Sequence, residues 1–531
     1  MTTIDVGTAA RQTPTLRDLS AREIVRRIAA GELSSTEAVE YFIARLKTVN
    51  GALNAVTADL SESARKTAAD VDKARSRGEK LPPLAGLPVT IKECFDLVGT
   101  ATTYGLTTRR SDIERTDDPY VAALRAAGAI PIAKTNLPQL MFYTETDNPL
   151  YGRTNNPWDL ERSCGGSSGG EAAVIGAGAS PFGLGNDIGG SLRIPAAFCA
   201  ITSIRPTAGR LPDHCAHGLP VGQTGIVSQV GPMARYVEDL VMGLRVLDRA
   251  RDPLVDPGPE FGDPSGVDLS RVRFATFTDD GEFPVAPAVK RAVAEAAQFL
   301  SAAGATAADW KPPPLSRATD LLFAALSGDA AASHRRLLRG NSVDRRLRPL
   351  LLIAAMPLWL RSVAGLALDG LGQRRLARNL RRFAPGTADA YWLAVEAIAN
   401  FRREIVCSLD DAGGGPVDLI LCPAHALPPI RHGATEMMPM AGAYVPLANV
   451  TGFPAGVVPV TRVRANEESG RPPSRDLIER VARETERGSA GLPIAVQVIA
   501  RPWRDHLALA AMAQIEAAAR KQPDYPARPP L

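Results

Sequence analysis

Short β-type runs are spread over almost the whole sequence and alternate with helical stretches. They are found at residues 129–133 (AIPIA), 418–423 (DLILCP), 455–460 (AGVVPV) and 493–500 (PIAVQVIA). Helix signals lie between them, such as Ser20 followed by Glu23, or Asp118 before Pro119. Strands that alternate with helices are typical of one sheet covered by helices on both faces. The sequence therefore predicts an α/β fold built on a central sheet.

The chain is long enough for two or three average domains, but no Gly/Ser-rich or Pro-rich linker divides its 531 residues. The likeliest seam lies at residues 251–266, which are rich in Pro, Gly and Asp, and a second loop-like patch at residues 467–474; neither has the composition of a flexible linker. We therefore expect a single domain over residues 1–531. Residues 320–401 are rich in Leu, Ala and Arg and have few strand signals, which predicts a helical insertion.

The middle of this insertion is unusually apolar. Residues 349–360 carry no charge, and the next helical turns place apolar side chains on one face, namely those of Trp359, Leu360, Val363, Leu366 and Ala367. Arginines flank the segment on both sides. This pattern predicts a substrate-entry element or a peripheral membrane contact through residues 345–382. A cap helix packed on the core, or a contact in a homodimer, accounts for the same pattern.

Composition excludes several classes of protein. With 61 basic and 57 acidic residues the net charge is only +4, and no nucleic-acid-binding motif is present. The six cysteines form no CxxC pair, which argues against a zinc ribbon or a disulfide framework. Residues 1–12 lack the pattern of a secretory signal, and no apolar run reaches the roughly 18–20 residues of a spanning helix. We expect a cytoplasmic protein, at most peripheral to a membrane.

The densest chemical signal is the glycine- and serine-rich stretch at residues 164–198. A phosphate-binding loop is one interpretation, since such loops present backbone N–H groups to anions. The stretch contains no GxxxxGK[ST] pattern and does not follow a clear strand, which argues against a nucleotide site.

A nucleophile elbow is a second interpretation, because residues 165–169 (GGSSG) satisfy GxSxG. An elbow needs a strand immediately before its serine, whereas residues 155–162 (NNPWDLER) have the composition of a loop. It also needs a histidine downstream. None of the available histidines lies in a motif that ties it to a serine; they are His214, His217, His334, His425, His432 and His506.

A third interpretation uses Ser191, which follows two glycines in residues 186–191 (NDIGGS). Glycines let backbone N–H groups converge on one point, as an oxyanion hole requires. A serine needs a base, and a buried lysine can serve because desolvation lowers its pKa. Lys92 ends a short β-type run and is the candidate base.

Three motifs extend this third interpretation. Residues 86–93 (GLPVTIKE), 165–171 (GGSSGGE) and 185–198 (GNDIGGSLRIPAAF) resemble the amidase signature family. Within that family the chain is most similar to the fatty acid amide hydrolases, through residues 94–105, 155–160, 231–235, 453–461 and 491–503. The resemblance implies an amidase-signature fold with a central mixed β-sheet and an enzyme that needs no metal or organic cofactor.

The resemblance also implies a Ser–Ser–Lys triad, in which Ser191 attacks the substrate and Ser167 passes its proton to Lys92. It places an oxyanion hole at the backbone amides of Ile188, Gly189, Gly190 and Ser191. It further implies a cis peptide bond between Gly166 and Ser167. Substrate is expected to contact Met141, Phe142 and Ser167.

Four neighbouring residues have more ordinary expected roles. Ser168 is expected to cap the helix that starts near Gly169, and Asp187 and Arg193 to brace the nucleophile loop. Cys94 is expected to be a packing residue. Asn186 stands where the family usually has threonine or serine, which predicts a changed hydrogen bond behind the nucleophile.

The expected activity is hydrolysis of carboxamide C–N bonds through an acyl-enzyme, with N-acyl amides, fatty acid amides and esters as candidate substrates. An aryl- or small-amide hydrolase with the same triad is the main alternative. An amidotransferase subunit, which would need partner subunits, and an inactive binding protein are the others.

Overall fold

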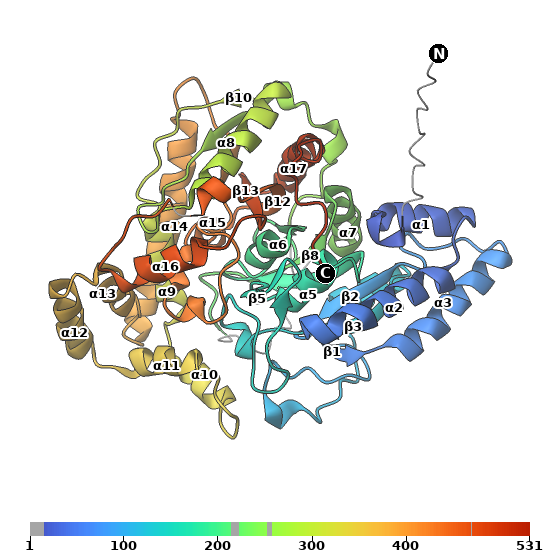
Figure 1. The fold of residues 1–531 in the computed structure, drawn as a ribbon, viewed down its shortest axis with the longest axis horizontal. Coiled ribbons are helices and arrows are strands. Elements are labelled where there is room, and N and C mark those ends of the chain that lie inside the picture. Colours follow the sequence, from blue (N-terminus) through green and yellow to red (C-terminus); the bar gives the residue numbers. More distant parts are fainter. Residues whose placement is uncertain (1–14, 214–221, 252–256, 469) are drawn as a thin grey trace, which may run out of the picture.

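The computed structural model describes residues 15–213, 222–251, 257–468 and 470–531. Eleven strands form one sheet in the order β1-β3-β2-β6-β8-β7-β12-β13-β11-β9-β10, and helices flank it (Figure 1). These strands are β1 (Val56–Asp59), β2 (Pro88–Lys92), β3 (Ile130–Thr135), β6 (Phe182–Asp187), β7 (Thr202–Arg205), β8 (Gln229–Ala234), β9 (Arg273–Thr276), β10 (Thr306–Ala307), β11 (Leu419–Pro423), β12 (Ala455–Arg462) and β13 (Pro493–Ala500). The predicted α/β fold with a central sheet is confirmed.

The sheet is mixed, as predicted. β2 lies between β3 and β6 and is parallel to both, and β9 is parallel to β10 and β11. Antiparallel pairs join the strands between these two groups, from β6–β8 to β11–β13. The strand predicted at residues 493–500 is buried along its whole length, in keeping with a sequence that is apolar except for Gln497.

Seventeen α-helices surround the sheet in the described ranges. They are α1 (Ala21–Ala30), α2 (Ser35–Leu53), α3 (Ser61–Ser76), α4 (Pro119–Ala126), α5 (Gly169–Gly176), α6 (Arg193–Cys199), α7 (Val237–Arg249), α8 (Pro287–Ala302), α9 (Ser316–Leu326), α10 (Ala332–Leu337), α11 (Leu347–Ala355), α12 (Leu358–Gly370), α13 (Arg374–Arg381), α14 (Ala388–Asp410), α15 (Pro446–Thr451), α16 (Leu477–Glu486) and α17 (Asp505–Ala519). The predicted starts of α1 and α4 are confirmed, since Ser20 and Asp118 accept hydrogen bonds from first-turn amides.

One local prediction is wrong. Residues 155–162, expected to be a loop, contain β4 (Asn155–Asn156) and most of β5 (Asp159–Ser163), which pair antiparallel in a separate two-stranded sheet. The side-chain amide of Asn156 holds this hairpin by donating to the carbonyls of Ser163 and Phe198. The hairpin leads into the Gly/Ser-rich loop but is not part of the central sheet.

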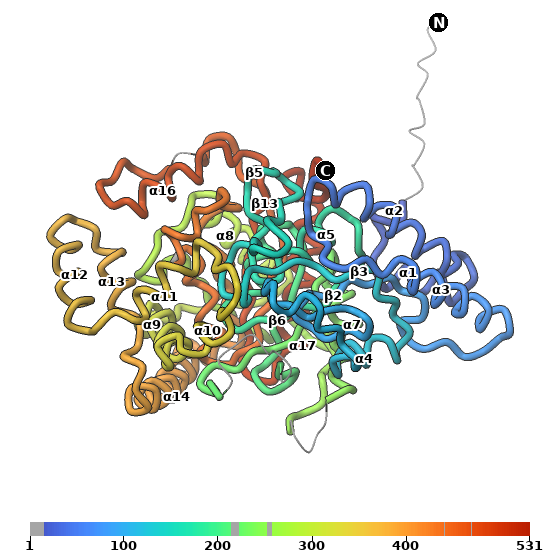
Figure 2. Tube along the Cα trace, turned by 90° about the horizontal axis from the view of Figure 1, so that it is seen from below, coloured from blue at the N-terminus to red at the C-terminus, as the bar shows by residue number. Residues whose placement is uncertain are grey.

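Residues 320–401 are helical, as predicted, and contain most of α9, all of α10 to α13 and the first part of α14. The α12–α13 part lies at the opposite end of the molecule from α1–α3 in both views (Figures 1 and 2). Trp359 and Leu366 on α12 are each 68% exposed. The alternative that this face packs on the core is therefore wrong for α12.

None of the described helices is by itself long and apolar enough to cross a membrane. Only α11 and α12 taken together reach the required length and composition, and they are bent by 119° at the break between them.

Candidate active site

The three predicted catalytic residues are attached to one region of the sheet. Lys92 is the last residue of β2, and Ser191 lies in the loop that follows β6. Because β2 and β6 are parallel neighbours, their carboxyl ends meet at the same sheet edge, where α/β proteins commonly bind ligands. Ser167 reaches this edge from the loop before α5.

Lys92 is fully buried and contacts two polar groups. Its Nζ lies 2.7 Å from Ser167 Oγ and 2.6 Å from Asn186 Oδ1. Burial lowers the pKa of Lys92 below its usual value, and nearby Cys94, Asp213, Asp187 and Glu171 oppose this effect only in part. Lowering the pKa favours the neutral amine, which is the form that can accept a proton.

The Asn186 amide has a defined orientation. Its Nδ2 donates to Asp213 Oδ2 at 2.5 Å, which leaves Oδ1 facing Lys92. The reverse orientation would place two oxygens in contact without a proton between them. A neutral lysine can donate one N–H to Asn186 and keep its lone pair for the Ser167 hydroxyl. Asn186 thus links Lys92 to Asp213, a partner that was not predicted.

The two serines of the Gly/Ser-rich loop behave differently. The Gly166–Ser167 peptide bond is cis, as predicted. Ser168 occupies the N-cap position of α5, but its side chain makes no capping hydrogen bond; its Oγ lies 3.4 Å from the Asn186 carbonyl oxygen. The capping role predicted for Ser168 is therefore wrong.

Ser191 is connected to this loop through the backbone, because the Ser168 N–H donates to the Ser191 carbonyl at 3.1 Å. In the described part of the chain no hydrogen bond joins Ser167 Oγ to Ser191 Oγ. A proton relay is compatible with this absence, because catalytic hydrogen bonds are often long or poorly aligned before substrate binds.

Asp187 organises the nucleophile loop. Its buried carboxylate accepts hydrogen bonds from the Gly190 and Leu192 amides and from Asn449 Nδ2. Arg193 binds the same carboxylate through Nε (2.9 Å) and Nη2 (3.0 Å). Burial alone would raise the pKa of Asp187, but Arg193 holds it well below its usual value. The bracing expected of Asp187 and Arg193 is present.

This bracing changes the expected oxyanion hole. The Gly190 N–H donates to Asp187 Oδ1 at 2.8 Å and is therefore already used. The amides of Ile188, Gly189 and Ser191 donate to no other described residue. The four-amide hole is thereby corrected to three candidate donors, with Gly190 anchoring the loop.

An apolar cavity adjoins Ser191. Met141 and Phe142 line it, together with side chains from α9, α10 and α11 of the helical insertion. Met141 Sδ lies 3.7 Å from Asn186 Nδ2, so this side chain contacts the residue that is hydrogen-bonded to Lys92. The structure thus brings Met141, Phe142 and Ser191 to one cavity.

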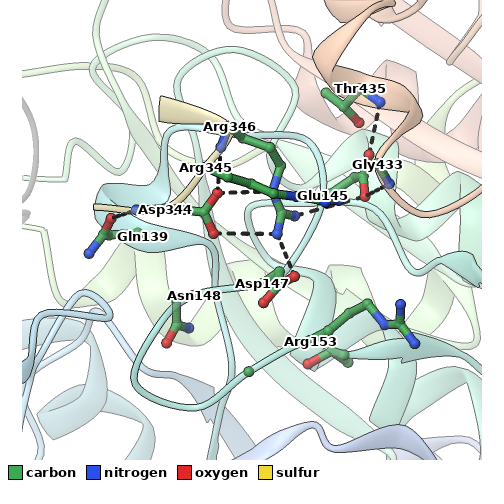
Figure 3. A network of polar contacts seen from close by, with 12 residues as sticks. Gln139, Glu145, Asp147, Asn148, Arg153, Asp344, Arg345, Arg346, Gly433 and Thr435 are labelled. Carbon is green, nitrogen blue, oxygen red and sulfur yellow. Dashed lines mark hydrogen bonds and ion pairs between the residues drawn. The ribbon is translucent and has the colours of Figure 1, made fainter. Parts of the chain in front are cut away.

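A buried ionic network, which was not predicted, joins the insertion to this cavity (Figure 3). The Arg346 guanidinium contacts Asp147, Asp344 and, at 3.9 Å, Glu145. Glu145 in turn accepts hydrogen bonds from the Gly433 and Thr435 amides, each at 2.8 Å. The network holds the start of α11 and two cavity-lining loops together. In the sequence Arg346 is one of several flanking arginines, and no local signal distinguishes it.

The other candidate residues have minor roles. Cys94 is buried and its pKa is raised by burial, as expected of a packing residue. His214 and His217 lie outside the described residues. No group of His, Cys, Asp or Glu side chains in the described ranges is arranged to hold a metal ion. Glu171, also not predicted, is buried between Thr90 and Thr135, and burial raises its pKa to about 8.

Comparison with known proteins defines the class. A family model described as Amidase matches residues 37–509. The chain therefore belongs to the amidase signature family, whose members the motifs resembled, and it is a hydrolase of amide C–N bonds.

Individual relatives refine this placement. The chain is 35% identical over 508 residues to fatty-acid amide hydrolase 1 of Sus scrofa, covering 93% of this chain and 84% of the relative. It is 31% identical over 499 residues to fatty acid amide hydrolase 1 of Caenorhabditis elegans, covering 92% and 86%. A solved fatty acid amide hydrolase has a TM-score of 0.79 at 24% identity, covering 94% and 85% of the two chains. The enzyme is thus similar to fatty acid amide hydrolases over most of its length.

Proposed function

We propose that this enzyme hydrolyses N-acyl amides through an acyl-enzyme formed on Ser191. Ser191 Oγ attacks the carbonyl carbon while its proton passes through Ser167 to neutral Lys92. The same relay returns the proton to the nitrogen of the departing amine as the C–N bond breaks. Water then attacks the ester, and the relay runs again to release the acid and restore Ser191.

One observation carries the proposal: the fully buried Lys92 lies 2.7 Å from Ser167 Oγ. A buried lysine without an adjacent carboxylate is costly as an ammonium, and its nearest oxygens here belong to a hydroxyl and a carboxamide. This environment favours the neutral base. An inactive binding protein would have no need for such a lysine.

The amides of Ile188, Gly189 and Ser191 are the proposed oxyanion donors. They surround the nucleophile on a loop whose shape depends on the Asp187–Arg193 pair. Loss of one such donor typically costs about 100-fold or more in rate.

The substrate is proposed to be an amide with an apolar acyl group. The cavity beside Ser191 is lined mostly by apolar side chains, among them Leu322, Phe323 and Leu351. Relatives named as fatty-acid amide hydrolases are consistent with this chemistry. Short or aryl amides are the alternative substrates, and esters are further candidates.

The first experiment measures hydrolysis of N-acyl amides and anilides, from acetyl to oleoyl, by mass spectrometry. We expect kcat/KM to rise with acyl length and to vanish in Ser191→Ala. Ser489→Ala is the matched control, because this buried hydroxyl donates to the Glu486 carbonyl and does not line the cavity. Full activity in Ser191→Ala would refute the nucleophile. Cleavage of short or aryl amides alone would refute the acyl-chain assignment.

We further propose that residues 345–382 contact a lipid surface and that the enzyme is otherwise cytoplasmic. Among the described residues, seven of the fourteen exposed large apolar side chains lie between Leu352 and Leu371. α11, whose Leu350 and Leu351 line the cavity, leads directly into the exposed face of α12. The exposed Arg348 and Arg374 would favour anionic lipid.

Co-sedimentation with phosphatidylcholine vesicles, with and without phosphatidylserine, tests this contact. Wild type is expected to bind, more strongly with phosphatidylserine, and Trp359→Ser/Leu366→Ser to bind weakly. If neither protein binds and wild type alone is dimeric by light scattering, the face is a homodimer contact and the lipid proposal fails.

A further inference from the structure

The cavity beside Ser191 contains three polar side chains with unused hydrogen-bonding groups. Thr319 on α9, His334 on α10 and Thr435 in the 3-10 turn Ala434–Glu436 all line it. Neither ring nitrogen of His334 and neither threonine hydroxyl has a hydrogen-bond partner in the described part of the chain, and these atoms are buried. Buried polar side chains in native proteins are nearly always paired. These three therefore need a partner that the described chain does not supply.

His334 packs against one of the residues expected to contact substrate. Its ring packs edge-on against Phe142, with ring centroids 4.8 Å apart and an interplanar angle of 87°. Phe142 follows Met141, whose sulfur contacts the Asn186 amide. The imidazole is only 4% exposed.

The two threonines approach the same cavity from other elements. Thr319 lies one helical turn before Leu322, and the Leu322 side chain lies 3.5 Å from the position that a Cβ on Gly189 would occupy. Thr435 is held in place through its backbone, since its N–H donates to Glu145 Oε1. Most of the other lining residues are apolar; the further polar ones include Tyr143, Ser327 and Glu436.

The chemistry of the three groups indicates what would bind them. Burial lowers the pKa of His334 and outweighs the opposing effect of Asp329, while Arg335 lowers it further. A neutral imidazole offers one N–H donor and one nitrogen acceptor, and a threonine hydroxyl also donates and accepts. A hydroxyl group matches both. A charged group would lose its hydration in a cavity lined mostly by apolar side chains, and the charged lining residue Glu436 is already paired with Arg345 at 3.1 Å.

We propose that His334, with Thr319 and Thr435, forms a polar subsite that binds a hydroxyl group on the acyl chain of the substrate. The inference rests on the proposed function, because the cavity holds an acyl group only if Ser191 is the nucleophile. The enzyme then prefers hydroxylated N-acyl amides to the corresponding unsubstituted amides. The reaction at the C–N bond is unchanged.

The test uses the full-length enzyme and primary amides of one C18 acyl chain, unsubstituted or with a single hydroxyl at successive positions. The readout is the ratio of kcat/KM for each hydroxylated amide to that of the plain amide. We expect a ratio of about 10 for at least one isomer with wild type, and a ratio near 1 with His334→Phe. Thr319→Val and Thr435→Val are expected to lower the ratio to a smaller extent.

Thr451→Val is the matched control. Thr451 is equally buried, donates to the Leu447 carbonyl and does not line the cavity, so the ratio should stay at its wild-type value. Hydrolysis of the plain amide without preference for any isomer, or a preference that survives His334→Phe, overturns the subsite and leaves the proposed function standing. Failure to hydrolyse any amide overturns the proposed function, and this inference with it.

Discussion

The contact between Asn186 and Lys92 permits a test of the base by moving one charge. In the double variant Asn186→Asp/Asp213→Asn, the carboxylate and the carboxamide exchange places. The hydrogen bond between the two side chains can be kept, now donated by the amide at position 213, and the net charge is unchanged. The negative charge then lies in direct contact with Lys92 Nζ, at about the 2.6 Å of the wild-type contact.

The size of the effect follows from this distance. Two unit charges 2.6 Å apart attract by about 6 kcal/mol at an effective dielectric constant of about 20. Desolvation of the carboxylate offsets much of this attraction. Neighbouring opposite charges usually change a pKa by about 1–3 units. The exchange therefore raises the pKa of Lys92 and moves the acid limb of kcat/KM to higher pH by about 1–3 units.

The sign is well defined because only the neutral amine accepts a proton. At a pH well below the pKa of Lys92, each unit by which that pKa is raised lowers the fraction of neutral Lys92 tenfold. At such a pH the variant should therefore be about 10–1000-fold less active than wild type, and its activity should return as the pH is raised. The assay is kcat/KM for an N-acyl anilide as a function of pH.

Asp213→Asn alone supplies a control of opposite sign. It retains an oxygen that can accept from Asn186 but removes a negative charge that raises the pKa of Lys92, so the acid limb should move to lower pH. If the two variants move the limb in the same direction, or neither moves it, Lys92 is not the titrating base.

Three further predictions concern the surroundings of the site. Gly190→Ala should lower kcat by about 100-fold and destabilise the fold by about 1–3 kcal/mol. Gly190 has a φ of +109°, and an added Cβ would lie 2.5 Å from the Val445 side chain, so the loop that carries Ser191 must shift. Activity assays measure the first effect and thermal unfolding the second. Arg346→Met should lower the free energy of unfolding by about 3 kcal/mol and raise KM, because it leaves the carboxylates of Glu145 and Asp344 without their counter-charge. Urea unfolding measures the stability, and an unchanged urea midpoint would contradict the role of the network. Glu171→Gln should become more stable relative to wild type as the pH rises from about 5 to about 8. In this range Glu171 ionises readily in the unfolded chain, whereas burial keeps it protonated in the native state, so wild type loses stability and the glutamine variant does not. Parallel Tm–pH curves for the two proteins would contradict this.

Much of the fold could be predicted from local pattern. The strands at residues 418–423, 455–460 and 493–500 are largely apolar runs, and such runs are typical of strands buried on both faces. β5 was missed because its sequence, DLERS, is mostly polar. Asn156 holds this strand by hydrogen bonds to Ser163 and to Phe198, and Phe198 is 42 residues away, beyond any local sequence window.

The site divides in a similar way. Lys92, Ser167 and Ser191 were identified because each lies in a compact motif of small and polar residues. Asp213 was missed, since it is 27 residues from Asn186 and lies in no motif. His334 was recognised only as a histidine without an associated serine, and its unpaired ring became visible once α9, α10 and the 434–436 turn enclosed one cavity.

The sequence by itself determined the class of fold, the elements that carry the catalytic side chains and the family to which the chain belongs. These follow from periodicity, glycine placement and short motifs, all of which act over a few residues. Only the tertiary structure decided that Lys92 is completely buried, that Gly190 is bound by Asp187, and which face of the insertion lines a cavity and which is exposed. Burial and charge pairing depend on distances between segments far apart in the chain, and those distances exist only once the sheet has assembled.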